Sequence, residues 1–458
     1  MSAVSALPET LLNGGSAGDI VNAEVPAEYL AAYLRAEDVD MFAGARDKDV
    51  RKSIRVGYVP MPELAPDEVL VAVMASSVNY NTVWSAMFEP VPTFRFLKQF
   101  ARHGGWAARH DLPHQVIGSD AAGVIVRVGT GVRTWRVGDH VVISPAYVDD
   151  QEPASHADGM MGAEQRAWGF ETNFGGLAEY TVVRASQLVP KPGHMTWEEA
   201  ACNTLCAGTA YRMLVSDNGA RIKQGDVVLI WGAAGGLGGY ASQFVANGGG
   251  IAVGVVGSEA KAEAARRLGC EVVITRDEIG LDGVNELSAW NEVGKRLGTL
   301  VRERAGRDPD IVFEHVGRAT FAVSVFVARR GGTVVTCGSS TGFEHVFDNR
   351  YLWMRLKRVI GSHVANLQEQ WECGRLIGSG RIATTMSEVH PLADVGHAVR
   401  LVQRNEHTGK VAVLCMAPRE GLGVTDSGLR ERLGEERIRP LHGWRQRDRR
   451  VPAAAELG

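Results

Sequence analysis

Long uncharged apolar runs are absent from this chain of 458 residues. A membrane-spanning helix needs roughly 18 such residues in a row, so no transmembrane segment is predicted. Cysteine is also scarce, with six residues, which is too few for a disulfide framework in a chain of this length. The N-terminal stretch lacks the basic start and the apolar core of a secretion signal. These absences predict a reduced, cytoplasmic protein with no membrane partner.

A surplus of charge of either sign is missing as well, because 49 Lys and Arg residues stand against 53 Asp and Glu residues. The net charge of −4 provides no basic surface for nucleic acid, so no such partner is expected. With 45% hydrophobic and 22% charged residues, the composition excludes a disordered chain and a coiled coil. Glycine, in contrast, is abundant, with 54 residues in frequent clusters. Such clusters indicate tight turns and close approach of the backbone to a ligand.

The chain divides into three parts by its pattern of residues. A helix is predicted at residues 26–35, and short strands between about 54 and 190 are typical of a small barrel or sandwich. Continuous apolar strands then alternate with amphipathic helices, which indicates a parallel sheet covered on both faces. The last forty or so residues are charged and expected to fray, apart from a short helix at 428–433. We predict an α/β protein with an N-terminal extension and a β-rich domain at 1–205, a doubly wound Rossmann domain at 206–362, and a return segment with a charged tail at 363–458.

A strand, a glycine-rich turn and a helix follow one another near the start of the predicted Rossmann domain. The strand Val227–Trp231 leads into the sequence GAAGGLGG and then into a helix. Bare glycines let the backbone approach a pyrophosphate, which binds at the helix N-terminus. Close packing of helix on strand without a ligand is the alternative. The cofactor-binding residues predicted here are Gly232, Ala233, Gly235, Gly236, Leu237 and Gly238.

The residues after the next strand favour NADPH over NADH as the cofactor. NADH-binding proteins usually have an acidic residue at this strand end, whereas here Ser258 and Lys261 are present and Glu259 comes later than expected. A serine hydroxyl and a lysine can bind a 2′-phosphate, and Arg276 after the following strand can close the site. The alternative for Lys261 is a solvated charge on a helix face.

The order of the three parts resembles the medium-chain dehydrogenase/reductase superfamily, whose GroES-like catalytic domain is completed by the C-terminal part. Zinc-containing members have a Gly-His-Glu run where this chain has Gly118, Ser119 and Asp120. No cysteine precedes Cys202, and Cys202 and Cys206 lack the further ligands of a zinc site. We therefore predict no metal, and a substrate that needs no Lewis acid, such as an activated C=C bond.

Several long motifs resemble the crotonyl-CoA carboxylase/reductase family. They include NYNTVW, WGFETNFGG, DIVFEHVG, RVIGSHVAN and GKVAVLCM, and the resemblance extends from about residue 40 to about residue 425. It implies NADPH-dependent reductive carboxylation of a 2-enoyl-CoA with CO2 to an alkylmalonyl-CoA. It also implies a homotetramer, for which the strand with the sequence VVTCG, expected near the edge of the Rossmann sheet, is a candidate for pairing across subunits.

The same resemblance assigns a CO2 site. In it, Asn81 donates an N–H to one CO2 oxygen, and Phe170 walls the pocket against bulk water. Glu171 and His363 hold a water that contacts the other oxygen. Each residue also has a plain structural alternative: a helix cap for Asn81, core packing for Phe170 and His363, and an ion pair for Glu171. Tyr80 is a candidate for orienting the substrate or for supplying a residual proton.

Three departures from the family pattern bear on the substrate. Val316 replaces a usual proline, Val364 a phenylalanine and Gly338 an alanine, and two of these changes remove volume near the expected acyl pocket. We therefore expect acyl chains longer or more branched than crotonyl, and a product that serves as a polyketide extender unit. Arg355 and Arg358, at helical spacing in a basic cluster, are candidates for binding CoA phosphates, with a solvated helix face as the alternative.

Two rival functions remain open from the sequence. One is a plain NADPH-dependent enoyl-CoA or quinone reductase, which protonates the substrate instead of carboxylating it. The other is a catalytically silent NADPH-binding protein. The complete set of CO2-site residues argues against the first, and that set together with the intact glycine-rich turn argues against the second.

Overall fold

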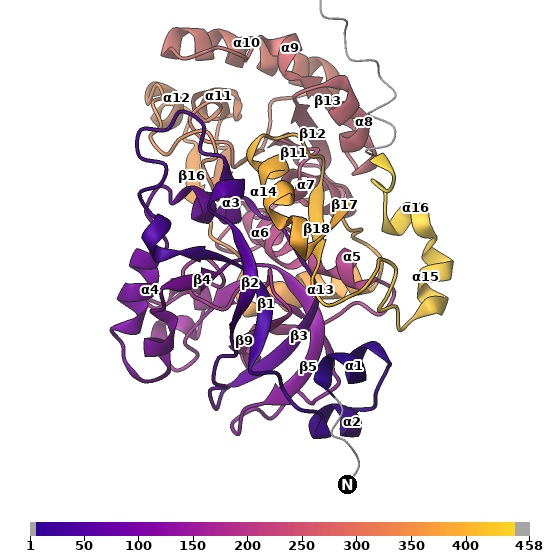
Figure 1. Cartoon of the computed structure of the whole chain (residues 1–458). Coiled ribbons are helices and arrows are strands. Elements are labelled where there is room, and N and C mark those ends of the chain that lie inside the picture. The colour runs from indigo at the N-terminus through magenta and orange to yellow at the C-terminus, as the bar shows by residue number, and fades with distance from the viewer. Residues whose placement is uncertain (1–5, 445–458) are drawn as a thin grey trace, which may run out of the picture. The chain divides into compact units, whose positions relative to one another are not determined.

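The computed structural model describes residues 6–444, which form two compact units (Figure 1). The first unit holds the residues up to Leu205 together with Asn366–Gly378 and Glu388–Glu435. The second unit holds Cys206–Ala365, Ser379–Ser387 and the described residues 436–444. The residues 363–458, expected from the sequence as one return segment, are thus divided between the two units.

The first unit is built mainly from short strands. Its helices are α1 (Leu7–Leu12), α2 (Ala17–Asn22), α3 (Tyr80–Met87), α4 (Phe94–Ala101), α5 (Trp197–Ala201), α13 (Leu367–Gly378), α14 (Val395–Gln403) and α15 (Ser427–Leu433). Its strands are β1 (Glu28–Arg35), β2 (Arg55–Pro60), β3 (Glu68–Ser77), β4 (His114–Val116), β5 (Ala121–Val128), β6 (His140–Ile143), β7 (Ala146–Tyr147), β8 (Arg166–Ala167), β9 (Tyr180–Arg184), β10 (Leu188–Pro190) and β18 (Lys410–Leu414). The elements that run across a boundary between the units are α6 (Thr204–Leu214), β17 (Met386–Pro391) and α16 (Glu435–Ile438).

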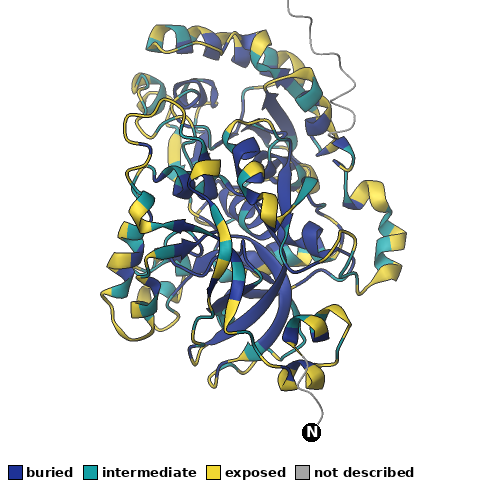
Figure 2. Ribbon diagram, viewed as in Figure 1, coloured by how far each residue is buried: buried dark blue, intermediate teal, exposed yellow. Residues whose placement is uncertain are grey.

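A seven-stranded sheet forms the centre of the first unit. Its order is β10-β6-β5-β3-β18-β17, and β9 also pairs with β3. All ten residues of β3 are buried, because the strand has partners along both of its edges and apolar neighbours on both faces. Figure 2 shows β3 and most of β5 as buried ribbons. The β-rich GroES-like domain predicted from the sequence is confirmed.

A second sheet of the first unit corrects the prediction for residues 26–35. These residues contain strand β1, not a helix, and β1 pairs antiparallel with β2 and β4. Tyr29 and Ala31 are buried on one face of the strand, and Ala32 and Leu34 on the other. Burial on both faces removes the alternation that identifies a strand in a sequence.

The second unit contains a parallel sheet of six strands in the order β13-β12-β11-β14-β15-β16. This order and the helices between the strands are those of a Rossmann domain, as predicted. The strands are β11 (Val227–Trp231), β12 (Ile251–Val256), β13 (Val272–Thr275), β14 (Ile311–Glu314), β15 (Thr333–Thr336) and β16 (Arg358–Gly361). The helices are α7 (Gly236–Asn247), α8 (Glu259–Arg267), α9 (Arg276–Ile279), α10 (Leu287–Ala305), α11 (Phe321–Val327) and α12 (Arg350–Trp353).

The strand expected near the sheet edge lies inside the sheet. Strand β15, with the sequence TVVT, pairs with β14 on one side and with β16 on the other. The edge strand is β16, where Arg358, Val359 and Gly361 are exposed. Strand β15 therefore has no free edge with which to pair across subunits.

The C-terminal part is packed as far as residue 444. The helix predicted at 428–433 is confirmed as α15, but the expected fraying around it is wrong, because Ile438, Leu441 and Trp444 are buried. Arg267 lies 5.5 Å from the ring centre of Trp444. The rest of the tail, 445–458, lies outside the described residues. Within residues 6–444, no helix combines the length and the apolar character needed to cross a membrane.

Candidate functional site

Asn81 lies in the first turn of α3, directly after the central strand β3. Its Nδ2 donates a hydrogen bond of 2.8 Å to Oγ of Ser119. The N-cap residue of α3 is Asn79, so Asn81 does not cap this helix, and the plain structural alternative for it is wrong. Tyr80 begins the helix, its ring packs edge-on against Trp84 at 5.3 Å, and burial raises the pKa of its hydroxyl.

The residue after Ser119 is a fully buried carboxylate. Asp120 forms an ion pair of 3.0 Å with Nζ of Lys410, which is itself 3% exposed. A buried charge requires both a counter-ion and hydrogen bonds to every oxygen. The further donors to Asp120 are Ser77 Oγ at 2.9 Å, Asn79 Nδ2 at 2.8 Å, Thr204 Oγ1 at 2.6 Å and the Leu205 N–H at 2.8 Å. These bonds fix the Gly118–Asp120 segment against β3 and the start of α3.

The Gly118–Asp120 segment does not fit a zinc ion. Ser119 is bonded to an amide, and the Asp120 carboxylate is neutralised by a lysine. Among the residues that the structure describes, no three His, Cys, Asp or Glu side chains form a group that could hold a metal.

The turn with Phe170 and Glu171 packs directly on the same segment. Gly169 has a φ of +71°, and a Cβ on it would lie 1.8 Å from the Gly118 carbonyl oxygen. Only glycine permits this approach and this conformation. The Gly176 N–H also donates to the Gly118 carbonyl, at 2.9 Å. The glycines of the WGFETNFGG motif therefore bring Phe170 and Glu171 next to the segment that holds Asn81.

The side chains of this turn have defined partners. The ring of Phe170 lies 6.0 Å from that of Phe96 on α4, and Phe170 is only half-buried, so it is not a plain core residue. Glu171 Oε2 accepts a hydrogen bond of 2.7 Å from the Ala167 N–H. Glu171 makes no ion pair within residues 6–444, which leaves its other oxygen available for a water.

His363 belongs to the second unit, where it follows the edge strand β16. Its side chain is exposed, so it is not a core histidine of that unit. The next residue, Val364, is buried and has a φ of +52°, a region that β-branched residues rarely adopt. The structure thus brings Asn81, Phe170 and Glu171 together in the first unit, while His363 and Val364 are neighbours in the second.

The other two departures from the family pattern also lie in the second unit. A Cβ on Gly338 would touch only the His315 carbonyl oxygen, at 3.6 Å, so there is open space beside this glycine. Val316, unlike a proline, keeps an N–H, which donates to Glu314 at 2.8 Å. Glu314 is fully buried, and burial raises its pKa.

The glycine-rich turn between β11 and α7 is tightly folded. Gly232 has a φ of +62°, and a Cβ on Gly238 would lie 2.4 Å from the Gly232 carbonyl oxygen. Gly235 is the N-cap of α7, so the helix begins without a side chain in front of its free N–H groups. Ala233 is buried and Leu237 half-buried beside them. This geometry suits a pyrophosphate at the helix N-terminus.

Several polar side chains lie at the C-terminal end of β12. Ser258 caps α8, and its Oγ accepts from the Lys261 N–H at 3.3 Å, which leaves the hydroxyl proton available. The guanidinium of Arg276 lies over Gly257, where a Cβ would be 2.9 Å from Nη2. Arg276 pairs with Asp282 at 3.4 Å, but its buried Nε has no partner in the described part of the chain.

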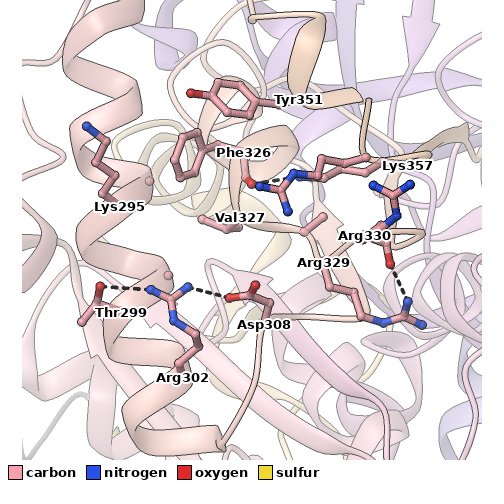
Figure 3. Close-up of a pocket in the computed structure, with 14 residues that line it drawn as sticks. Lys295, Thr299, Arg302, Asp308, Phe326, Val327, Arg329, Arg330, Tyr351 and Lys357 are labelled. Carbon is pink, nitrogen blue, oxygen red and sulfur yellow. Dashed lines mark hydrogen bonds and ion pairs between the residues drawn. The ribbon is translucent and has the colours of Figure 1, made fainter. Parts of the chain in front are cut away.

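A basic cavity of about 340 Å³ lies within the second unit (Figure 3). Arg302 on α10 bonds Asp308 at 2.7 Å and Thr299 at 3.2 Å, and Phe326 packs against Tyr351 at 4.6 Å. Among the lining side chains, six are basic and only Asp308 is acidic. The basic residues are Lys295, Arg302, Arg329, Arg330, Arg355 and Lys357.

Lys357 is the most deeply set cation of this cavity. Its Nζ donates to the carbonyl oxygens of Val325 at 2.7 Å and Phe326 at 2.9 Å, which uses two of its three donors. Burial, with Arg355 nearby, lowers the pKa of Lys357 to about 8. Arg355, which the sequence proposed as a ligand of CoA phosphates, is among the residues that line the cavity, and Arg358 is not. Arg358 begins strand β16, so the two do not share a helix face.

Sequence reasoning missed part of both sites. Ser119 was noted only as the residue in place of a zinc ligand, and Lys295, Arg302 and Arg329 were not singled out. Their positions depend on contacts between distant segments. The one local signal is on α10, where Gly294 directly precedes Lys295 and a Cβ on it would lie 2.6 Å from the Phe326 ring.

Comparison with known proteins gives consistent matches. The GroES-like domain of alcohol dehydrogenases matches residues 65–193, and the zinc-binding dehydrogenase family matches residues 236–376. A crotonyl-CoA reductase from Streptomyces collinus is 52% identical over 91% of this chain and 94% of its own length. A crotonyl-CoA carboxylase/reductase from Cereibacter sphaeroides is 40% identical over 87% of this chain and 90% of its own.

A solved structure is more similar still. It is that of the 2-octenoyl-CoA carboxylase reductase CinF from a Streptomyces species, in complex with NADP and 2-octenoyl-CoA. Its sequence is 66% identical, its TM-score with this chain is 0.95, and the match covers 96% of this chain and 99% of that one.

Proposed function

Because this chain belongs to the crotonyl-CoA carboxylase/reductase family, we propose that it converts a 2-enoyl-CoA and CO2 into an alkylmalonyl-CoA with NADPH as reductant. The observation that carries the proposal is the chain of contacts within the first unit from Asn81 through Ser119 and Gly118 to the Phe170–Glu171 turn. A reductase that only protonates its substrate needs a proton donor at the α-carbon. It does not need an apolar side chain that excludes water, such as Phe170, beside an amide donor, such as Asn81.

The proposed reaction forms two bonds on the substrate. NADPH supplies a hydride to the β-carbon, which leaves an enolate at the α-carbon and the thioester oxygen. The α-carbon then attacks the carbon of CO2 and forms a carboxylate. This route takes up no proton, whereas protonation of the α-carbon gives the saturated thioester. The enzyme must therefore keep proton donors away while it holds CO2.

The residues of the first unit suit this task. CO2 is apolar overall and its oxygens are weak acceptors, so it needs few donors and little water. Asn81 offers amide N–H groups, and Phe170 with its neighbour Phe96 provides an apolar wall. In our proposal, Glu171 and His363 hold one water against the second CO2 oxygen. Fixed dipoles in a dry site stabilise developing charge without reorganisation.

We propose that NADPH binds to the second unit. The N–H groups at the start of α7, together with Gly232, Ala233, Gly235, Gly236, Leu237 and Gly238, are proposed to bind the pyrophosphate. Ser258, Lys261 and Arg276 are proposed to bind the 2′-phosphate. The buried Nε of Arg276, which lacks a partner among the described residues, supports this assignment.

We propose that the preferred acyl chain is longer than crotonyl. The space beside Gly338 and the small side chain of Val364 support a wide pocket in the second unit. The relative at 66% identity was solved with 2-octenoyl-CoA. An alkylmalonyl-CoA with a long side chain is a suitable polyketide extender unit, and we propose that the enzyme supplies one in the cytoplasm.

The basic cavity of the second unit is the proposed site for CoA phosphates. Arg355 and Lys357 belong to the basic cluster of the sequence, and Arg302 and Arg329 add fixed guanidinium groups to the cavity. Guanidinium and ammonium groups bind phosphate by charge-assisted hydrogen bonds. The half-buried ring of Tyr351 at the cavity can pack against an adenine.

We propose a homotetramer in which β16 provides one interface. Strand β16 has no partner on its outer edge within the described residues. Exposed apolar side chains lie near it: Trp353 at 61%, Met354 at 55%, Leu356 at 64% and Val359 at 40%. A strand with one unpaired edge and exposed apolar neighbours favours pairing with a second copy of the chain.

The proposed function is tested by NADPH oxidation with crotonyl-CoA and 2-octenoyl-CoA, with and without bicarbonate, followed by mass analysis. We expect bicarbonate to accelerate oxidation and the product to carry one additional carboxyl group, with 2-octenoyl-CoA preferred. Oxidation that ignores bicarbonate and yields only saturated thioester would identify a plain reductase.

A further inference from the structure

Ser119 makes its one side-chain hydrogen bond within the described residues to Asn81. The serine is 1% exposed, and its Oγ lies 2.8 Å from Asn81 Nδ2. The other amide atom, Asn81 Oδ1, is buried and has no hydrogen-bond partner in residues 6–444. This arrangement leaves both the amide oxygen and the serine hydroxyl proton unsatisfied, which is unfavourable in a buried place.

Rotating the side-chain amide of Asn81 by 180° gives both groups a hydrogen-bond partner. The rotation exchanges Oδ1 and Nδ2 without changing the shape of the side chain. Ser119 then donates its hydroxyl proton to Oδ1, so both groups have a partner. The two N–H groups of Nδ2 now occupy the position where no protein atom is available to bond, and they can bind an acceptor that enters the site.

We propose that Ser119 is a positioning residue that holds the Asn81 amide with its N–H groups toward CO2; this inference rests on the proposed function. The oxygens of CO2 accept hydrogen bonds and donate none, so only the N–H side of the amide can hold it. The amide oxygen in that place would repel the CO2 oxygens. The Ser119 hydroxyl selects the orientation because, among the described residues, it is the one partner that can donate to Oδ1.

Ser119 is itself held rigidly, as a positioning residue must be. Its neighbour Asp120 is anchored by the buried Lys410, and its neighbour Gly118 is held against Gly169. The Oγ therefore cannot follow a rotating amide. Without the hydroxyl, the amide would be free to present either side.

The test compares Ser119→Ala with Ser85→Ala in the full-length enzyme. Ser85 is on α3, as Asn81 is, and is 1% exposed, but its hydroxyl has no partner among the described residues, so its loss is a matched control. For each protein, the ratio of carboxylated to merely reduced product and the KM for CO2 are measured with excess enoyl-CoA and NADPH. We expect Ser119→Ala to lower the product ratio at least fivefold and raise the KM for CO2, with total NADPH oxidation changed less than twofold.

Ser119→Thr guards against a purely structural effect, because it keeps the hydroxyl, and we expect it to restore most of the product ratio. A Ser119→Ala enzyme with the wild-type ratio and KM would overturn the inference, as would equal changes in Ser85→Ala. If Ser119→Ala does not fold, a Ser119→Thr enzyme with a collapsed product ratio overturns it and one with the wild-type ratio supports it. A wild-type enzyme that forms no carboxylated product would instead refute the proposed function.

Discussion

The backbone conformation of Val364 is strained, which bears on its proposed role in the acyl pocket. Its φ of +52° lies in the left-handed region, where a non-glycine residue is strained by about 1–3 kcal/mol. The residue is nevertheless buried and directly follows His363. Strain of this kind persists only where the surrounding structure imposes it, which is consistent with a residue that shapes a pocket.

Replacing Val364 with phenylalanine tests that role. Phenylalanine is not β-branched, so the left-handed φ of this residue strains it no more than it strains valine, while the ring fills the proposed acyl space. We expect the kcat/KM ratio of crotonyl-CoA to 2-octenoyl-CoA to rise about tenfold, which is about 1.4 kcal/mol of discrimination. Gly338→Ala, whose Cβ meets only the His315 carbonyl, should shift the ratio in the same direction by less. An unchanged ratio in Val364→Phe would contradict the wide pocket.

Residue identities could be predicted from motifs, but their partners could not. The sequence pointed to Asn81, Phe170 and Glu171, and the structure brings these three to one segment. The hydrogen bond from Asn81 to Ser119 joins residues 38 positions apart, and that between Lys410 and Asp120 joins residues 290 positions apart. No local spacing encodes such contacts.

Among the structural elements, the turn at 168–171 depends most on one glycine. In Gly169→Ala, the new Cβ would meet the Gly118 carbonyl at 1.8 Å, in addition to the cost of a φ of +71°. Gly104→Ala is a matched control with a φ of +72° and nothing within 4 Å. We expect urea unfolding to show a loss of about 1–2 kcal/mol for Gly104→Ala and about 2–5 kcal/mol for Gly169→Ala. Equal losses would show that the two segments are not tightly packed.

The basic cavity predicts a pH dependence for binding of the CoA moiety. The pKa of Lys357 is lowered to about 8 by burial, and a bound phosphate would raise it by favouring the charged form. Lys357 is therefore protonated below pH 8 and loses its charge above it, so we expect the KM for enoyl-CoA to rise between pH 7 and pH 9.5. The matching enoyl-pantetheine, which lacks the nucleotide phosphates, should show no such rise, and Lys357→Arg should flatten it. A KM that changes equally for both thioesters would argue against phosphate binding here.

The elements of the Rossmann domain were predicted well, whereas strand β1 was not. The alternating strands and helices of the Rossmann domain produced the correct fold, because each helix has one apolar face. Strand β1 was mistaken for a helix, since a central strand in a small sheet carries apolar residues at both odd and even positions. Strand β15 lies near the sheet edge, as expected, but has no free edge of its own, because strand order is set by tertiary pairing, which local pattern does not reveal.

At the scale of the whole molecule, the exposed edge of β16 predicts assembly. Val359→Lys adds a charge to this edge and should weaken pairing of two copies. If the proposed assembly through β16 is correct, we expect sedimentation analysis to show a smaller species than the wild-type protein forms, with unchanged circular dichroism. Val21→Lys on α2, which is 53% exposed, is the control and should keep the wild-type size. A Val359→Lys protein of wild-type size would place the interface elsewhere.

The proposal that the Asn81 amide holds CO2 is tested most directly by the products of Asn81→Leu. Leucine keeps the size of the side chain but removes its amide donors. The wild-type and variant enzymes are supplied with 2-octenoyl-CoA, NADPH and saturating bicarbonate in D2O, and the products are analysed by mass. We predict mainly the carboxylated thioester from the wild type, and mainly the saturated thioester with one deuterium at the α-carbon from Asn81→Leu, at a comparable rate of NADPH oxidation. A variant that still forms mainly the carboxylated product would contradict the claim that the Asn81 amide holds CO2.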